Sequence, residues 1–217
     1  MKYYDENGKE IIIPDSVFSV EDNHGKCGTI YKFSDDLCIK RYDRDIYFDY
    51  CLLNTSIYDD LKTIKSDNLV DIKMPLYKDN KSIIDAYLLT YYKEQYDDFL
   101  EIPTEYLLYN LEEILKLIKE ISEYKIRLDD LKRENIILTK DNIVLIDPDR
   151  WYYKFKDSEK EIEKLNINNI MAMFSKITEK SLQDNHLDFL IENNLYDYVI
   201  SSKLFPLTSN KDRAMKV

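Results

Sequence analysis

The residues best suited to chemistry lie in two short segments of the second half of the chain. The first reads LDDLKRENIIL and contains Asp130, Lys132 and Asn135. The second reads LIDPD and adds Asp147 and Asp149 after an apolar run that predicts a strand. A carboxylate can orient a hydroxyl, an ammonium can neutralise a transferring phosphoryl group, and an amide with further carboxylates can hold Mg²⁺. This set indicates phosphoryl transfer from a nucleotide.

A glycine-containing segment lies near the start of the chain. Residues 23–31 read NHGKCGTIY, with Gly25 and Gly28 after Asn23. The whole chain has only 3 Gly, so two of them within one short segment are not expected from a random distribution. Glycine lets backbone N–H groups approach phosphate oxygens, and Asn tolerates the positive φ that such a loop needs. Lys40 follows at the end of the strand-like run LCIK.

Taken together, these segments resemble the protein kinase family. Residues 128–135 are similar to its catalytic loop H-R-D-L-K-P-E-N, and residues 147–149 stand at its D-F-G motif. Residues 23–31 look like its Gly-rich loop, and residues 37–40 match its V-A-I-K strand. The likeness is to small, divergent, bacterial-type members of the eukaryotic-like kinases, with the aminoglycoside and choline kinases as related phosphotransferases. It covers residues 18–151 best.

The resemblance implies an α+β protein with a bilobal protein kinase-like fold. An antiparallel β N-lobe is expected over residues 1–92 and a reduced, mainly α C-lobe over residues 93–217. The sequence pattern agrees with this plan, because strand-like runs dominate the first part and 3.6-residue periodicity the second. Asn7-Gly8 predicts a hairpin. Further strands are expected at 17–20, 29–33, 37–41, 69–72, 74–77, 83–89, 136–138 and 143–146, and helices at 46–64, 104–124, 162–177 and 187–200.

The resemblance also assigns roles to the candidate site residues. Asp130 is expected to orient the acceptor hydroxyl and Lys132 to stabilise the transferring group. Nucleotide contacts are expected from Asn23, Gly25, Lys26, Gly28, Lys40, Thr90 and Tyr91. Metal ligands are expected at Asn135, Asp147 and Asp149. Kinases pair the strand lysine with a helix Glu, but no Glu occurs between Glu21 and Glu94, so Asn54 or Asp60 is the expected partner.

The expected activity is transfer of the γ-phosphate of ATP, with Mg²⁺, to a hydroxyl of a protein Ser or Thr. Lys132 favours a protein acceptor, because small-molecule kinases of this fold usually lack it. One alternative is a small-molecule kinase of the aminoglycoside and choline kinase type, favoured by Asp149 and the short region after it. Another is a pseudokinase that acts as a binding module, favoured by the missing helix Glu and the reduced glycine loop.

Composition excludes several other classes of function. The formal net charge of −11 argues against nucleic-acid binding, which needs a cationic surface. We expect no membrane association, since no apolar run is long enough to span a bilayer and no signal peptide opens the chain. The three cysteines have no paired spacing, which is typical of a reducing compartment. The sequence therefore predicts a cytoplasmic protein.

Overall fold

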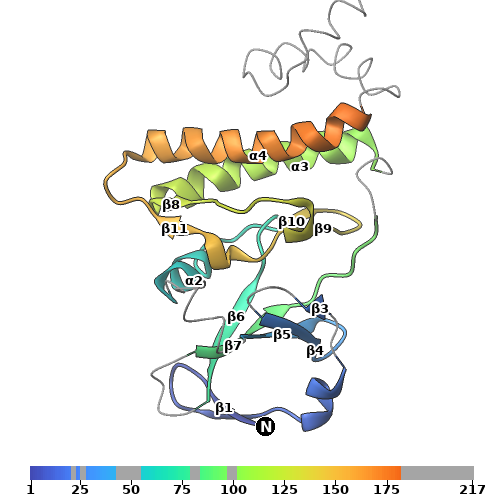
Figure 1. Cartoon of the computed structure of the whole chain (residues 1–217), viewed down its shortest axis with the longest axis vertical. Helices are drawn as coiled ribbons and strands as arrows, with labels where there is room; N and C mark the ends of the chain where they lie inside the picture. Colours follow the sequence, from blue (N-terminus) through green and yellow to red (C-terminus); the bar gives the residue numbers. More distant parts are fainter. Residues whose placement is uncertain (21–22, 25–27, 43–54, 79–83, 97–101, 182–217) are drawn as a thin grey trace, which may run out of the picture.

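The computed structural model describes residues 1–20, 23–24, 28–42, 55–78, 84–96 and 102–181 of the chain. They form a mixed α and β structure with an antiparallel sheet at one end and two long helices at the other (Figure 1). The sheet has the order β2-β1-β6-β7-β5-β4-β3. Its strands are β1 Lys2–Tyr4, β2 Glu10–Ile12, β3 Asn23–His24, β4 Gly28–Lys32, β5 Leu37–Tyr42, β6 Ile72–Tyr77 and β7 Ile84–Thr90.

The predicted hairpin around Asn7-Gly8 is confirmed, because β1 and β2 pair antiparallel and Gly8 has a φ of 80°. The strand predicted at 17–20 is wrong, since η1 (Asp15–Ser19) is a 3₁₀ turn. Pro14 starts this turn, and its carbonyl accepts a hydrogen bond from the Val17 amide at 3.1 Å. A short apolar run after a proline can form such a turn as readily as a strand.

The centre of the sheet separates two apolar clusters. Along β5 the side chains alternate, so that Cys38 and Tyr42 pack on the side of the short helix α2 (Thr55–Leu61). Ile39 faces the other way and packs with Tyr3 and Ile13. This alternation places Lys40 on the α2 side, in register with Ile30 on β4 and Tyr87 on β7.

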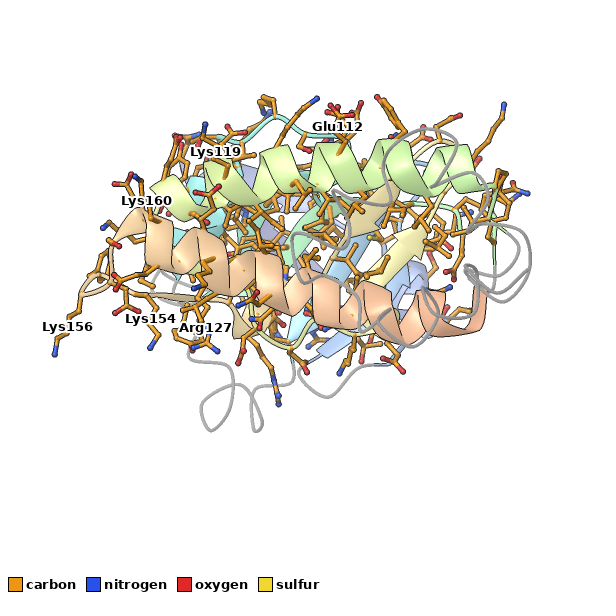
Figure 2. The ribbon with its side chains drawn as sticks, turned by 90° about the horizontal axis from the view of Figure 1, so that it is seen from above. Glu112, Lys119, Arg127, Lys154, Lys156 and Lys160 are labelled. Atoms are coloured by element: carbon orange, nitrogen blue, oxygen red, sulfur yellow. The ribbon has the colours of Figure 1, made fainter. Side chains whose placement is uncertain are left out.

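Helices α3 (Thr104–Glu123) and α4 (Glu159–Ser181) lie side by side and antiparallel, as both views show (Figures 1 and 2). The apolar stripe of α3 is buried in the main core, at Ile114, Ile118 and Ile121. Lys125 ends this helix in the left-handed conformation, with φ 62°. None of the helices in the described ranges combines the length and the hydrophobicity needed to cross a membrane.

Two small sheets and two turns lie between these layers (Figure 1). β8 (Ile126–Arg127) pairs with β11 (Tyr152–Tyr153), and β9 (Ile136–Leu138) pairs with β10 (Ile143–Leu145). The turn η3 (Arg133–Asn135) ends the loop that carries Asp130, and the turn η4 (Pro148–Arg150) follows Asp147 directly. A parallel bridge between Leu69 and Leu145 ties β10 to the segment before β6.

Most predicted elements outside 17–20 correspond to elements of the structure, with different ends. The helix predicted at 46–64 is described only as α2, because residues 43–54 lie outside the described residues, as does the helix predicted at 187–200. The run 69–72 contributes one bridge before β6 begins at Ile72. The predicted division at residue 92 falls in the connection between β7 and α3 and stays a prediction.

Candidate active site

A cavity of about 780 Å³ lies between the large sheet and the two loops. This volume is within the range of small-molecule sites in proteins. The sheet contributes Gly28 and Lys40 to its lining, and the loops contribute Asp130, Asn135 and Asp147. The structure thus brings together residues that the sequence separates by more than a hundred positions.

Lys40 is held by two carboxylates from the loop after β10. Its ammonium contacts Asp147 closely and lies 2.6 Å from Oδ2 of Asp149. The two acids differ in exposure, since 38% of the Asp147 side chain and only 2% of the Asp149 side chain reach solvent. Asp147 has a φ of 60°, and this left-handed turn places both acids on the same side as the lysine.

Asp149 is enclosed by hydroxyl groups as well as by the lysine. Its Oδ1 accepts hydrogen bonds from Tyr42 at 2.9 Å and from Tyr58 of α2. The two tyrosine oxygens lie 2.9 Å apart. The ring of Tyr58 stacks on Tyr87 with centroids 4.0 Å apart, which fixes the hydroxyl at the carboxylate.

Burial and charge together set the pKa values in this cluster. Burial alone would lower the pKa of Lys40, but the Asp149 and Asp147 carboxylates raise it to about 12. Burial opposes ionisation of Asp147, and the Lys40 ammonium outweighs it and lowers that pKa. Burial raises the pKa values of Asp149, Tyr42 and Tyr58. Lys40 therefore carries a positive charge at neutral pH.

Asp130 has the geometry of a residue constrained by its surroundings. Its φ of 55° is unusual for a residue other than glycine, and Asp is among the residues that tolerate it. Oδ2 lies 3.3 Å from the Lys132 ammonium and 3.8 Å from Nε of Arg150. A carboxylate so placed can accept a hydrogen bond from a hydroxyl group at the cavity wall.

Asn135 closes the Asp130 loop from inside. The side-chain nitrogen of Asn135 donates a hydrogen bond to the backbone carbonyl of Asp130 at 2.8 Å. The backbone carbonyl of Asn135 accepts a hydrogen bond from the Ile146 amide at 3.0 Å. The second bond joins this loop to the segment that carries Asp147. Because Asn135 donates with Nδ2, its side-chain oxygen is the atom that it can offer to a cation.

Two asparagines of α4 hold the strand that leads into Asp130. The Leu128 amide donates to Oδ1 of Asn166 at 2.8 Å, and the Leu128 carbonyl accepts from Nδ2 of Asn169 at 2.7 Å. Asn166 is fully buried and also donates to the Ile126 carbonyl at 2.9 Å. Sequence reasoning did not identify these residues, although asparagines on an apolar helix face are a signal of buried polar contacts.

The predicted glycine segment is described only in part. Asn23 pairs with Ile30 in the sheet, while Gly25 and Lys26 lie outside the described residues. Gly28 pairs with Tyr42, and a Cβ at Gly28 would come within 2.4 Å of the Arg41 carbonyl oxygen. Strand packing alone therefore requires a glycine here, in addition to any approach of a nucleotide.

Thr90 and Tyr91 line the same cavity at the end of β7. Their amides are already engaged, because Thr90 donates to the Asp71 carbonyl and Tyr91 to the Asp36 carbonyl, each at 2.9 Å. These two amides are thus not available to a base, although the side chains still border the space where one would lie.

Two of the predicted roles need correction. Asp60 is not the partner of Lys40, because its carboxylate accepts a hydrogen bond from Tyr153 at 2.5 Å. Asn54, the other candidate, lies outside the described residues. Asp149 does not fit the predicted role of metal ligand, since both of its oxygens are buried and occupied by Lys40, Tyr42 and Tyr58.

Asn135 and Asp147 remain suitable for a metal ion that arrives with a nucleotide. Among the described residues, no group of three or more His, Cys, Asp or Glu could hold a metal. Magnesium commonly uses one or two protein ligands and completes its shell with phosphates and water. The half-exposed carboxylate of Asp147 and the side-chain oxygen of Asn135 fit that requirement.

Comparison of the chain with models of known protein families and with curated proteins found no match. The function is therefore argued from the geometry of the site and the resemblance of its motifs.

Proposed function

We propose that this chain is a phosphotransferase that moves the γ-phosphate of Mg·ATP to a hydroxyl, most readily of a protein Ser or Thr. One observation carries the proposal. Lys40 of the sheet forms an ion pair with Asp147 of the loop after β10. Both residues line the same cavity as Asp130, Lys132 and Asn135. These are the groups that phosphoryl transfer uses, and their order along the chain supports the proposal of a bilobal protein kinase-like fold.

Each residue then has a task in the reaction. Lys40 holds the α and β phosphates, and Asp130 orients the acceptor hydroxyl. The acceptor oxygen forms a bond to the γ-phosphorus, the bond from that phosphorus to the bridging oxygen breaks, and ADP leaves. The hydroxyl proton passes to the Asp130 carboxylate. Lys132, half exposed beside Asp130, neutralises charge on the transferring group.

Asn135 and Asp147 would hold the magnesium ion, which neutralises phosphate charge when it is bound. Lys40 contacts Asp147 in the structure. Phosphate oxygens compete for the ammonium, and this competition frees the exposed Asp147 carboxylate. Most of the rate enhancement comes from position and electrostatics, because the protein forms no covalent intermediate in this scheme.

A melting experiment tests the nucleotide site. We expect ATP with Mg²⁺ to raise the melting temperature by several degrees, since a ligand at about a hundred times its Kd adds roughly 2.7 kcal/mol. Asp147→Asn should abolish the dependence on Mg²⁺. Incubation with γ-labelled ATP, mixed protein substrates, and a panel of sugars and amino alcohols then distinguishes a protein kinase from a small-molecule kinase.

A binding module without transfer is the second candidate, favoured by the close pairing of Lys40 with Asp147. That pairing occupies both groups that a nucleotide complex needs. A binding module predicts nucleotide binding that is weak or independent of Mg²⁺, and no label on any acceptor.

A further inference from the structure

Lys40 has two acidic partners that differ in kind. Asp147 lies on the cavity wall with more than a third of its side chain exposed, whereas Asp149 lies behind the lysine with 2% exposed. An exposed carboxylate can exchange one partner for another at little cost. A buried carboxylate that loses its counter-ion leaves an uncompensated charge, which is strongly unfavourable. The pair of Lys40 with Asp149 is therefore the one that should persist when a ligand enters.

The surroundings of Asp149 hold its carboxylate in one orientation. Oδ2 faces Lys40 at 2.6 Å, and Oδ1 accepts from Tyr42 and Tyr58. These hydroxyls offset the cost of burying the carboxylate without adding a competing positive charge. Tyr42 comes from the same strand as Lys40, two residues on, and Tyr58 comes from α2. The carboxylate is thus anchored to both elements that surround the lysine.

We propose that Asp149 is the positioning residue for Lys40. It holds the ammonium toward the cavity as a fixed buried counter-ion, while Asp147 exchanges Lys40 for other ligands. The inference rests on the proposed function of the site and deepens it. It gives Asp149, with Tyr42 and Tyr58, the task that the helix Glu performs in protein kinases and that was expected here of Asn54 or Asp60.

Nucleotide affinity in a double-mutant cycle tests this role. The native chain, Asp149→Asn, Lys40→Met and the double variant are titrated with a fluorescent ATP analogue and Mg²⁺, and then with ATP and adenosine as competitors. A charged hydrogen bond of this kind corresponds to roughly tenfold or more in affinity. We expect Asp149→Asn and Lys40→Met each to weaken ATP binding by about that factor. The double variant should bind no more weakly than Lys40→Met.

The affinity for adenosine distinguishes a loss of Lys40 positioning from a general distortion of the cavity. Lys40 acts on phosphates in this proposal, so each variant should bind adenosine as the native chain does. An equal loss of ATP and adenosine binding in Asp149→Asn would overturn the inference, because the residue would then be supporting the cavity as a whole. Additive losses in the cycle would also overturn it.

Tyr58→Phe provides a second route if Asp149→Asn does not fold. The phenyl ring keeps its stack on Tyr87 and loses only the hydroxyl that reaches Asp149. We expect a few-fold loss of ATP affinity in the native background and none in the Lys40→Met background. Equal losses in both backgrounds would contradict the role. Absence of Mg·ATP binding by the native chain would instead remove the proposed function itself, and this inference with it.

Discussion

The backbone amide of Leu128 donates a hydrogen bond to the side chain of Asn166, a residue 38 positions later on α4, at 2.8 Å. Leu128 stands two residues before Asp130. The hydrogen bond to α4 therefore fixes the position of the backbone from which the Asp130 loop begins. Asn169 completes the arrangement through the carbonyl of the same leucine. Helix α4, which packs on α3 at the end of the molecule opposite the large sheet, thus contributes directly to the geometry of the candidate site (Figure 1).

Replacing Asn166 with Ala should destabilise the chain by about 2 kcal/mol or more. The change leaves the Leu128 amide and the Ile126 carbonyl without their partner in a fully buried place. Asn168→Ala on the exposed face of the same helix is the matched control and should change stability by less than about 0.5 kcal/mol. Urea unfolding measures both, and equal stabilities would contradict the role of Asn166.

Replacing Asp130 with Ala should lower phosphate transfer by roughly a hundredfold or more, because the acceptor hydroxyl loses its base. The affinity for ATP should stay within a few-fold, since no nucleotide contact is assigned to this side chain. Asp129→Ala removes the neighbouring carboxylate, whose nearest cation is Arg127 at 3.9 Å, and should leave transfer nearly unchanged. Initial rates with labelled ATP measure both, and full activity in Asp130→Ala would exclude the proposed mechanism.

Replacing Gly28 with Ala should cost about 1–3 kcal/mol of stability. The added Cβ meets backbone atoms of Arg41, which cannot rotate away as a side chain could. Gly8→Asn is the control, because Asn tolerates the positive φ of that turn. We expect thermal melting to show a clear loss for Gly28→Ala and little for Gly8→Asn. A native-like melting temperature for Gly28→Ala would mean that β4 and β5 can separate at low cost.

Stability should fall as the pH rises above about 10. The pKa of Lys40 is raised to about 12, and burial raises those of Tyr42 and Tyr58 well above their ordinary value of 10. The unfolded chain releases these protons first, so folding weakens by about 1.4 kcal/mol per pH unit for each group. Below the unfolded values this contribution is fully present.

Tyr58→Phe should flatten that alkaline slope by about one group, or 1.4 kcal/mol per pH unit. Urea unfolding at several pH values between 9 and 11.5 measures it. The same slope in Tyr58→Phe and the native chain would show that this hydroxyl does not titrate as its burial requires.

Local patterns in the sequence predicted most strands of the sheet and helix α3, because alternation and 3.6-residue spacing act over a few residues. The resemblance of the motifs to those of the protein kinase family predicted that Lys40, Asp130, Asn135 and Asp147 would share a site. The partner of Lys40 could not be found in this way. Asp149 is 109 positions away, and nothing near it in sequence indicates burial.

The tyrosines were missed for a related reason. Tyr58 lies on the apolar face of a short helix, where the pattern indicates packing, and it does pack on Tyr87. Its second role depends on a hydroxyl that meets Asp149 only in the folded chain. The ring of a tyrosine can pack on an apolar face while its hydroxyl group binds a carboxylate. Its position in a hydrophobic pattern therefore does not show whether the hydroxyl group has a partner.

The stack of Tyr58 on Tyr87 joins the helix beside the lysine to the middle of the sheet as one stiff unit. An outward swing of α2 would separate these rings and strip Asp149 of a donor in the same movement. The position of α2 and the surroundings of Lys40 are therefore coupled through one pair of aromatic rings and one hydroxyl group.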